Sequence, residues 1–439
     1  MNDTDKTGIS GLWEIAQTVF PGGVNASARF NKSIGRSFLV KSGQGSIIVD
    51  YEGREFIDLN MSHGASLLGY GNAQISKAIL QSINEGILCS HETPHQIHLA
   101  SKIIRLIASA EMVRFCGTGT EANMHAVRLA RAYTKKDIII KFEGHFHGYG
   151  DYLAFSKRPS IEWAGTEDTP IPQPESSGIP TAINKYIIVL PFNNFDVLEN
   201  VIKNQYHDIA AVIMEPVNYN SGTILPLTDY LERVRELTSK YNILLIFDEI
   251  LSGFQTGTDC MQGYFDITPD ISTVGKALGG GLPLSALVGR KEIMQTLSPI
   301  GKAMHSGTYI AHPTLILAAL AFLEVVDQDG FYPPIIERCN MLAEGFRAIF
   351  RKNKIGVKVQ SLGTRFSLLF GIPEEKHIAN YRDVASNDLT AAHKFYSLML
   401  KQGIYFHPSW HHGISAAHTD EQIHIILDAA ELVARDFSR

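Results

Sequence analysis

The chain has 439 residues, of which 45% are hydrophobic and 19% are charged, and its formal net charge is −6. A chain of this size can bury a large core and is expected to form more than one folding unit. The acidic balance, without a Lys/Arg cluster, argues against a nucleic-acid surface. No run of about 18 apolar residues predicts a membrane span, and the polar start MNDTDKTGIS does not resemble a secretion signal.

The first 70 residues predict a short amphipathic helix over 11–20 and two strands around the turn YEGRE within 45–60. From about residue 72, helices alternate with short apolar runs. Such runs, separated by helices, are typical of a mostly parallel sheet that is covered on both faces. The runs are MVRFCG (112–117), DIIIKFEG (137–144), KYIIVLPF (185–192), IAAVIMEP (209–216), ILLIFDE (243–249) and LSALVGR (284–290).

Residues 155–180 are rich in Pro, Ser and Gly without any period, which predicts a loop or lid. A helix is expected from about 313, followed by a second mixed segment that ends in a helix over 420–437. The four cysteines show no C-x-x-C spacing, so neither a zinc site nor a disulfide framework is expected. A reducing, cytoplasmic location fits this pattern.

Three polar residues follow apolar strands: Glu215 after AAVIM, Asp248 after ILLIF and Lys276 near DISTV. In open α/β sheets, ligands bind at the carboxyl ends of the strands. A buried carboxylate there is costly unless it has a partner. These three side chains are therefore candidates for one site.

A glycine-rich turn, Gly117-Thr118-Gly119-Thr120, joins the predicted strand around VRF to a helix. A strand, such a turn and a helix N-terminus together can bind phosphate through backbone N–H groups and hydroxyls. The turn matches neither the nucleotide P-loop nor the dinucleotide motif G-x-G-x-x-G. A small cofactor with a phosphate monoester is therefore expected.

These parts together favour pyridoxal 5'-phosphate (PLP). Its aldehyde forms a Schiff base with a lysine, and its pyridine nitrogen needs a carboxylate partner to be a strong electron sink. Asp248 supplies the carboxylate, and Lys276 lies 28 positions later among small residues in VGKALGGG. A solvated loop lysine is the alternative for Lys276.

Over nearly its whole length the chain resembles the class III aminotransferases of PLP fold type I, in particular the group around glutamate-1-semialdehyde 2,1-aminomutase. The motifs that carry the likeness are FPGGVNASARF, GTGTEANMHAVRLAR, KFEGHFHGYGD, IMEPV, LLIFDEILSGFQTG, PDISTVGKALGGGLPLSALVGRKEIM, HSGTYIAHP and SAAHTDEQI. The resemblance implies an α/β fold with a large domain (71–315) around a mostly parallel seven-stranded sheet. It also implies a small mixed α+β domain built from both termini (1–70 and 316–439).

The resemblance also assigns roles to residues. Lys276 and Asp248 would be the catalytic pair, and Arg29 would bind a substrate carboxylate with its bidentate fork. Thr308 would reach the phosphate of the partner subunit, which implies a homodimer with active sites at its interface. The remaining cofactor-binding residues would be Thr118, Gly119, Thr120, Phe146, His147, Glu215 and Asn220.

Two substrate-pocket positions differ from the aminomutase pattern. His63 stands where tryptophan is usual, and His411 and His412 replace a stretch that usually carries a glutamate. A ping-pong aminotransferase, acting on a carboxylate-bearing amino acid and a keto acid or aldehyde, is therefore predicted first, with His63 and His411 as further substrate residues. The alternatives are the aminomutase and a related PLP racemase. A non-catalytic PLP-binding regulator ranks last because Lys276 and Asp248 are both present. The histidine pairs show no recognisable metal-ligand spacing, so no metal is expected.

Overall fold

The computed structural model describes residues 8–437, and the polar stretch 1–7 lies outside this range. The chain forms two compact units. Unit 1 comprises Met1–Asn72, Pro334–Lys376 and Asn387–Arg439, and unit 2 comprises Ala73–Pro333 and His377–Ser386. Each unit therefore contains segments that are distant in the sequence.

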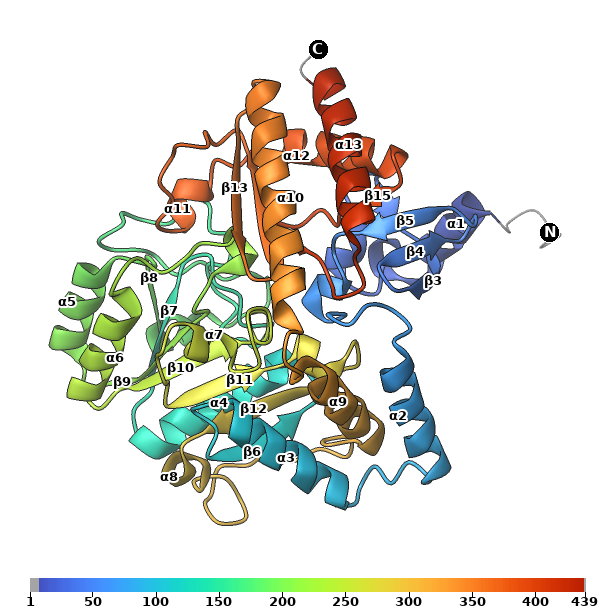
Figure 1. The fold of residues 1–439 in the computed structure, drawn as a ribbon. Coiled ribbons are helices and arrows are strands. Elements are labelled where there is room, and N and C mark those ends of the chain that lie inside the picture. Colours follow the sequence, from blue (N-terminus) through green and yellow to red (C-terminus); the bar gives the residue numbers. More distant parts are fainter. Residues whose placement is uncertain (1–7, 438–439) are drawn as a thin grey trace. The chain divides into compact units, whose positions relative to one another are not determined.

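Unit 2 is built on a seven-stranded sheet with the order β6-β12-β11-β10-β9-β7-β8 (Figure 1). Neighbouring strands from β11 to β8 run parallel, whereas β12 is antiparallel to both β6 and β11. The sequence prediction of a mostly parallel sheet is confirmed. The strands are β6 (Met112–Cys116), β7 (Ile138–Phe142), β8 (Ile187–Leu190), β9 (Ile209–Met214), β10 (Leu244–Glu249), β11 (Ile271–Val274) and β12 (Ser285–Gly289).

Helices cover this sheet. Helix α4 packs across β6, β9, β10, β11 and β12, and its side chains Ala126 and Leu129 share a core with Ile139, Ile213 and Ile246. Strands β9 and β10 are buried at every residue, because helices cover a parallel sheet on both faces. The helices of unit 2 are α2 (Ala73–Asn84), α3 (Pro94–Leu106), α4 (Gly119–Thr134), α5 (Phe195–Gln205), α6 (Tyr230–Lys240), α7 (Cys260–Tyr264), α8 (Lys291–Met294), α9 (Pro313–Val326) and α11 (Tyr381–Val384).

Unit 1 combines three small sheets with helices, as a mixed α+β unit. The sheets have the orders β1-β2, β15-β5-β4-β3 and β13-β14-β16. The strands are β1 (Phe30–Asn31), β2 (Arg36–Ser37), β3 (Val40–Gln44), β4 (Ile47–Asp50), β5 (Glu55–Asp58), β13 (Val357–Leu362), β14 (Arg365–Phe370), β15 (Ile404–Tyr405) and β16 (His412–Gly413). The helices are α1 (Ile9–Val19), α12 (Leu389–Lys401), α13 (Asp420–Phe437) and α10 (Tyr332–Lys352), whose first two residues belong to unit 2.

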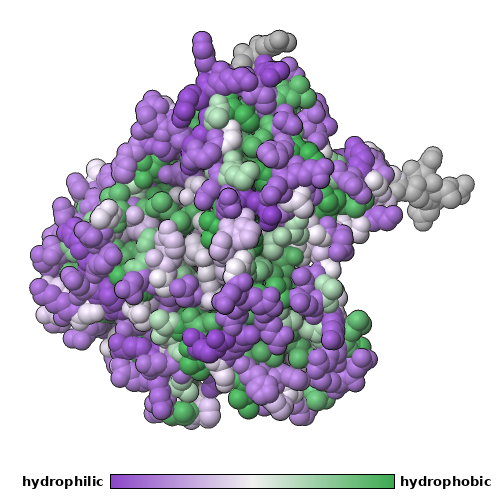
Figure 2. Space-filling model, viewed as in Figure 1, coloured by the Kyte–Doolittle hydropathy of each residue, from purple (hydrophilic) through white to green (hydrophobic). Residues whose placement is uncertain are grey.

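β15 pairs parallel with β5, so the C-terminal part of the chain completes the N-terminal sheet. Most residues on the visible surface are hydrophilic, with smaller hydrophobic areas between them (Figure 2). Among residues 8–437, no helix is both long and apolar enough to cross a membrane.

Candidate active site

The glycine-rich turn runs directly from β6 into α4, as the sequence predicts. Thr118 is the N-cap, and its Oγ1 accepts a hydrogen bond from Glu121 N at 3.2 Å. The Glu121 carboxylate in turn accepts from Gly117 N at 2.7 Å. The first turn of a helix leaves backbone N–H groups without an intrahelical acceptor, and the helix dipole favours an anion there. Gly119 and Thr120 therefore stand where a phosphate is best accommodated.

Ile250 joins the glycine-rich turn to the Lys276 turn. A Cβ added to Gly119 would lie 2.8 Å from Ile250 Cγ2, and one added to Gly275 would lie 3.0 Å from Ile250 Cδ1. Real Cβ atoms essentially never come closer than 3.0 Å. Glycine at both positions lets Ile250, two residues after Asp248, pack closely against both turns, and at Gly119 a larger residue would force a shift. The turn, Asp248 and Lys276 are thus brought together.

A third glycine holds the segment after β7 against the same turn. Gly148 has φ +92°, and a Cβ there would lie 2.4 Å from Thr120 Oγ1. Thr120 Oγ1 also accepts a hydrogen bond from Tyr149 N at 3.4 Å. Phe146 and His147, two of the predicted cofactor residues, consequently lie on a segment packed against Thr120.

Asp248 is the penultimate residue of β10, so it lies inside the strand rather than just beyond it as the sequence analysis had it. Its buried carboxylate accepts hydrogen bonds from Asn123 Nδ2 and His147 Nδ1, both at 2.7 Å, and from Ile250 N at 3.0 Å. Thr273 Oγ1 donates to Asn123 Oδ1 at 2.7 Å and so orients the amide. These donors fix the carboxylate in one orientation.

His147 is also buried, and its pKa is lowered because burial disfavours the charged ring, although the hydrogen bond to Asp248 opposes this shift. Its Nε2 atom has no hydrogen-bond partner within residues 8–437. A buried polar atom without a partner is unusual in a folded protein. The His147 and Asp248 pair thus combines a carboxylate held by several donors with a buried ring nitrogen that no described residue contacts through a hydrogen bond.

Glu215, the first residue after β9, forms hydrogen bonds with two more of the predicted cofactor residues. Its carboxylate accepts from Phe146 N at 2.7 Å and from Asn220 Nδ2 at 2.9 Å. Burial and the nearby charge of Asp248 raise the pKa of Glu215, while the two hydrogen bonds and the charge of Lys276 act in the opposite direction. The influence of Lys276 indicates that its ammonium belongs to the same electrostatic cluster.

Lys276 has φ +44°, in the left-handed region that non-glycine residues rarely adopt. Such a conformation costs about 1–3 kcal/mol and persists only where the surroundings enforce it. Its side chain is half-buried, and it begins a short 3-10 turn over Lys276–Gly279. Lys276 is therefore held in a strained, glycine-flanked turn, unlike a solvated loop lysine.

Two further lysines near Glu215 did not stand out in the sequence. Lys141, in β7, is fully buried, and its Nζ donates to the carbonyl oxygens of His145 and Phe155. Lys157 Nζ lies 3.9 Å from the centroid of the Phe146 ring. Burial lowers the pKa of each lysine to about 8. Lys141 could have been noticed in the sequence, because it lies within the apolar run DIIIKFEG, where a buried charged side chain requires hydrogen-bond partners.

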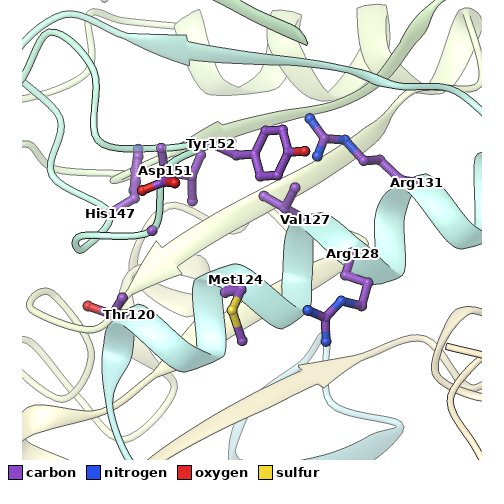
Figure 3. A pocket seen from close by; sticks show the side chains of 10 residues that line it. Thr120, Met124, Val127, Arg128, Arg131, His147, Asp151 and Tyr152 are labelled. Atoms are coloured by element: carbon purple, nitrogen blue, oxygen red, sulfur yellow. The ribbon is translucent and has the colours of Figure 1, made fainter. Parts of the chain in front are cut away.

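A cavity of about 430 Å³ runs beside α4 from Thr120 toward Arg131 (Figure 3). Figure 3 shows Arg128 and Arg131 along the helix, with Tyr152 facing it from the segment after β7. The Arg131 guanidinium lies 4.2 Å from the centroid of the Tyr152 ring. The glycine-rich turn thus borders an open cavity.

The remaining predicted residues lie elsewhere. Thr308 is exposed, in a turn of unit 2 just before α9. Arg29 and His63 line a cavity of about 490 Å³ in unit 1. His411, also in unit 1, is buried with its Nδ1 atom 2.5 Å from Arg365 Nη2. Within residues 8–437, no group of three or more His, Cys, Asp or Glu side chains is arranged to hold a metal ion.

These residues fit PLP on three structural grounds: a glycine-lined turn at a helix N-terminus, a fixed buried carboxylate, and a lysine in a strained turn, all joined by Ile250. Together with the sheet order, they define a PLP-dependent enzyme of fold type I. The model of the aminotransferase class-III family matches residues 30–430, and the chain belongs to this family.

Known proteins agree with this assignment. A glutamate-1-semialdehyde 2,1-aminomutase of Legionella pneumophila (strain Paris) is 38% identical over 432 residues, which is 98% of this chain and 99% of the relative. An omega-transaminase from Sphaerobacter thermophilus superposes with a TM-score of 0.93 at 28% identity, covering 99% of this chain and 98% of its own. A transaminase with PLP bound superposes with a TM-score of 0.87 at 26% identity, covering 98% and 97%.

Proposed function

We propose that this enzyme is an aminomutase that converts glutamate-1-semialdehyde to 5-aminolevulinate. The observation that carries the proposal is the full-length similarity to relatives of that name, 38% identical over 98% of the chain. The PLP site described above supplies the chemistry that such a reaction needs. The sequence alone predicts an intermolecular aminotransferase first, whereas the relatives favour the alternative, the aminomutase.

Bound PLP would act as an electron sink that stabilises negative charge on the substrate carbon next to the amine. In our proposal Lys276 Nζ would hold the cofactor aldehyde, and its free amine would act as the general base that takes the proton from that carbon. The turn that carries this lysine packs closely against Ile250, because a Cβ added to Gly275 would lie 3.0 Å from Ile250 Cδ1.

Asp248 faces the pyridine nitrogen in this proposal. An ionised carboxylate there would form a charge-assisted hydrogen bond with the ring N–H and keep that nitrogen protonated. Asn123 and His147 orient the carboxylate through their hydrogen bonds to Asp248 Oδ2. Gly119 and Thr120, with Thr118 as the helix cap, would hold the phosphate.

Phe146 would stack on the cofactor ring, and Glu215 with Asn220 would lie near its phenolic oxygen. The raised pKa of Glu215 favours a carboxyl that can carry a proton and donate a hydrogen bond to such an oxygen. Arg29 would bind the substrate carboxylate, with His63 and His411 as further substrate residues.

An intermolecular aminotransferase remains the second candidate. Two observations favour it: the His63 and His411 positions depart from the aminomutase pattern, and the omega-transaminase superposes with a TM-score of 0.93. An aminomutase must keep its substrate enclosed during two successive half-reactions, and a changed pocket affects that enclosure.

The test compares both reactions with the same enzyme preparation. Purified holoenzyme is given glutamate-1-semialdehyde, and 5-aminolevulinate is measured. In parallel, it is given a panel of amino acids with a keto acid acceptor, and amino transfer is measured. The proposal expects 5-aminolevulinate to form at least about tenfold faster than any transfer between molecules. Faster transfer between molecules would establish the second candidate.

We further propose a cytoplasmic homodimer in which Thr308 completes the phosphate site of the partner subunit. The segment around Thr308 supports an interface there, because Ile300, Met304 and Tyr309 are 69%, 64% and 71% exposed. Exposed apolar side chains gathered in one segment are typical of association surfaces. Light scattering that shows an active monomer would contradict this.

A further inference from the structure

The cavity in unit 1 contains His407, which is not among the residues that the sequence predicted to bind substrate. The cavity, of about 490 Å³, is lined by Arg29, His63 and His407 together with Asn60, Ser62 and several apolar residues. The His407 side chain is buried, with 8% of the residue exposed. Its ring centroid lies 4.5 Å from that of His63. The two imidazoles therefore share one wall of the Arg29 cavity.

The hydrogen bonding of His407 fixes which ring nitrogen carries the proton. Its Nε2 lies 2.8 Å from the carbonyl oxygen of Ala28. A carbonyl oxygen can only accept, so Nε2 must carry the hydrogen. Burial lowers the pKa of His407 to about 4, which keeps the ring neutral at pH 7. Nδ1 is then left with a lone pair and can only accept a hydrogen bond.

His407 Nδ1 has no hydrogen-bond partner within residues 8–437. Leaving a buried acceptor unsatisfied costs about 1–3 kcal/mol, so native proteins rarely retain one without a use. A donor supplied by a ligand in the adjoining cavity would satisfy it. Nδ1 therefore requires a hydrogen-bond donor from the ligand, because neither an acceptor nor a methyl group can satisfy a lone pair.

The neighbouring backbone is strained in the same place. Met61, Ser62 and His63 are consecutive non-glycine residues with φ of +47°, +52° and +55°. Each such residue costs about 1–3 kcal/mol, and the conformation persists only where the surroundings enforce it. The Asp58 carboxylate enforces it, accepting from Asn60 N at 2.7 Å and Met61 N at 3.1 Å. This strained turn presents His63 to His407, and strain of this kind gathers at functional sites.

We propose that His407 determines substrate specificity by accepting, at Nδ1, a hydrogen bond from a hydroxyl or amino group of a substrate whose carboxylate binds Arg29. The ligand class is therefore a short carboxylate that carries a hydrogen-bond donor along its chain. An amino acid with a hydrated aldehyde or a second amine belongs to this class. The inference rests on the proposed function only in taking Arg29 as the carboxylate anchor.

The test measures binding by calorimetry, so it does not depend on turnover. Holoenzyme is titrated with 3-hydroxypropionate, 4-hydroxybutyrate and 5-hydroxypentanoate, and with the parent acids that lack the hydroxyl. At one chain length we expect the hydroxy acid to bind about tenfold more tightly than its parent, the usual strength of one buried hydrogen bond.

Substitutions then locate the effect. His407→Phe keeps the aromatic ring but removes the acceptor, and it should abolish the preference for the hydroxyl while parent acids bind as before. His407→Gln keeps a donor for Ala28 and an acceptor for the ligand, so it should retain most of the preference. His424→Phe, on the exposed side of α13, is the control and should change neither affinity.

Equal binding of hydroxy and parent acids by the wild-type enzyme at every chain length would overturn the proposal, whether or not any variant folds. A preference that survives in His407→Phe would also overturn it. If none of the acids binds, the Arg29 anchor fails and this inference fails with it. A failure of the proposed reaction alone would leave the hydroxyl preference intact, so the two failures are distinguishable.

Discussion

The cofactor edge of unit 2 and the Arg29 cavity of unit 1 are built in different ways. At the cofactor edge, Asp248 and Glu215 are buried and every carboxylate oxygen has a donor, while three glycines allow the loops to touch. In the Arg29 cavity, the polar wall includes an acceptor without a partner beside a strained turn. At the cofactor edge the protein itself supplies the donors that hold the two carboxylates, whereas in the Arg29 cavity we propose that the substrate supplies the donor for His407 Nδ1.

Loss of Lys276 should have the largest effect. We expect Lys276→Ala to abolish measurable turnover while PLP still binds without a covalent bond, because the phosphate turn and Asp248 remain. Activity assays and the absorbance of the bound cofactor measure the two effects separately. Lys203→Ala, on the exposed surface of α5, is the control and should turn over normally. A Lys276→Ala enzyme with substantial turnover would remove this lysine from the mechanism.

Substitution of Asp248 should come next. Asp248→Asn keeps the size of the side chain but cannot hold a protonated pyridine nitrogen, so we expect kcat to fall by roughly a thousandfold or more with the fold retained. The exposed Asp208→Asn serves as a control. Circular dichroism and PLP content check folding and loading. Near-normal turnover with full PLP content would contradict the role given to Asp248.

A smaller and more selective effect is expected in unit 1. Arg29→Ala should raise the KM of a carboxylate substrate by about 10- to 100-fold, the strength of a charge-assisted hydrogen-bond pair. PLP binding should change less than about twofold. The exposed Arg351→Ala should alter neither quantity. If Arg29→Ala weakened the binding of PLP and of substrate equally, Arg29 would not act on the substrate alone, and the roles given to the two regions would be wrong.

The smallest effect concerns stability, not turnover. His418 is buried and its Nδ1 accepts hydrogen bonds from Ser415 N and Oγ, both at 3.1 Å. Burial lowers its pKa to about 4 from an ordinary value near 6.5. The unfolded chain therefore binds a proton more readily, and stability is lost as the pH falls from about 6.5 toward 4.

His418→Asn keeps an acceptor for Ser415 but cannot be protonated. The free energy of unfolding of the wild-type enzyme should fall by about 2 kcal/mol more between pH 7 and pH 5 than that of the variant. Urea denaturation at the two pH values measures this difference. An equal loss in both proteins would show that His418 does not contribute to acid sensitivity.

The sheet and the cofactor edge could be predicted from the sequence because their signals are local. Apolar runs mark β9 and β10, Thr118 marks the start of α4, and glycines mark the turns around Thr120 and Lys276. The role of Ile250 could not be predicted, because it depends on two glycines from distant segments meeting one side chain.

The details of the Arg29 cavity were also beyond the sequence. The unsatisfied Nδ1 of His407 follows from a contact with Ala28, 379 residues away. In the left-handed turn at Met61–His63, only His63 is of a residue type enriched at positive φ, so the local sequence signal for the turn was weak. The sequence shows Lys141 as a charged residue in an apolar strand. Its carbonyl partners could not be predicted, because the folded loop after β7 brings them to the lysine.

The most direct test of the account locates the lysine that bonds to PLP. Borohydride treatment of the holoenzyme makes that bond permanent, and mass spectrometry of the peptides identifies the modified residue. Three lysines compete for this role: Lys276, and the two near Glu215 whose pKa burial lowers to about 8, Lys141 and Lys157. The account predicts that the cofactor is found on Lys276 alone. Cofactor on Lys141 or Lys157 instead would contradict it.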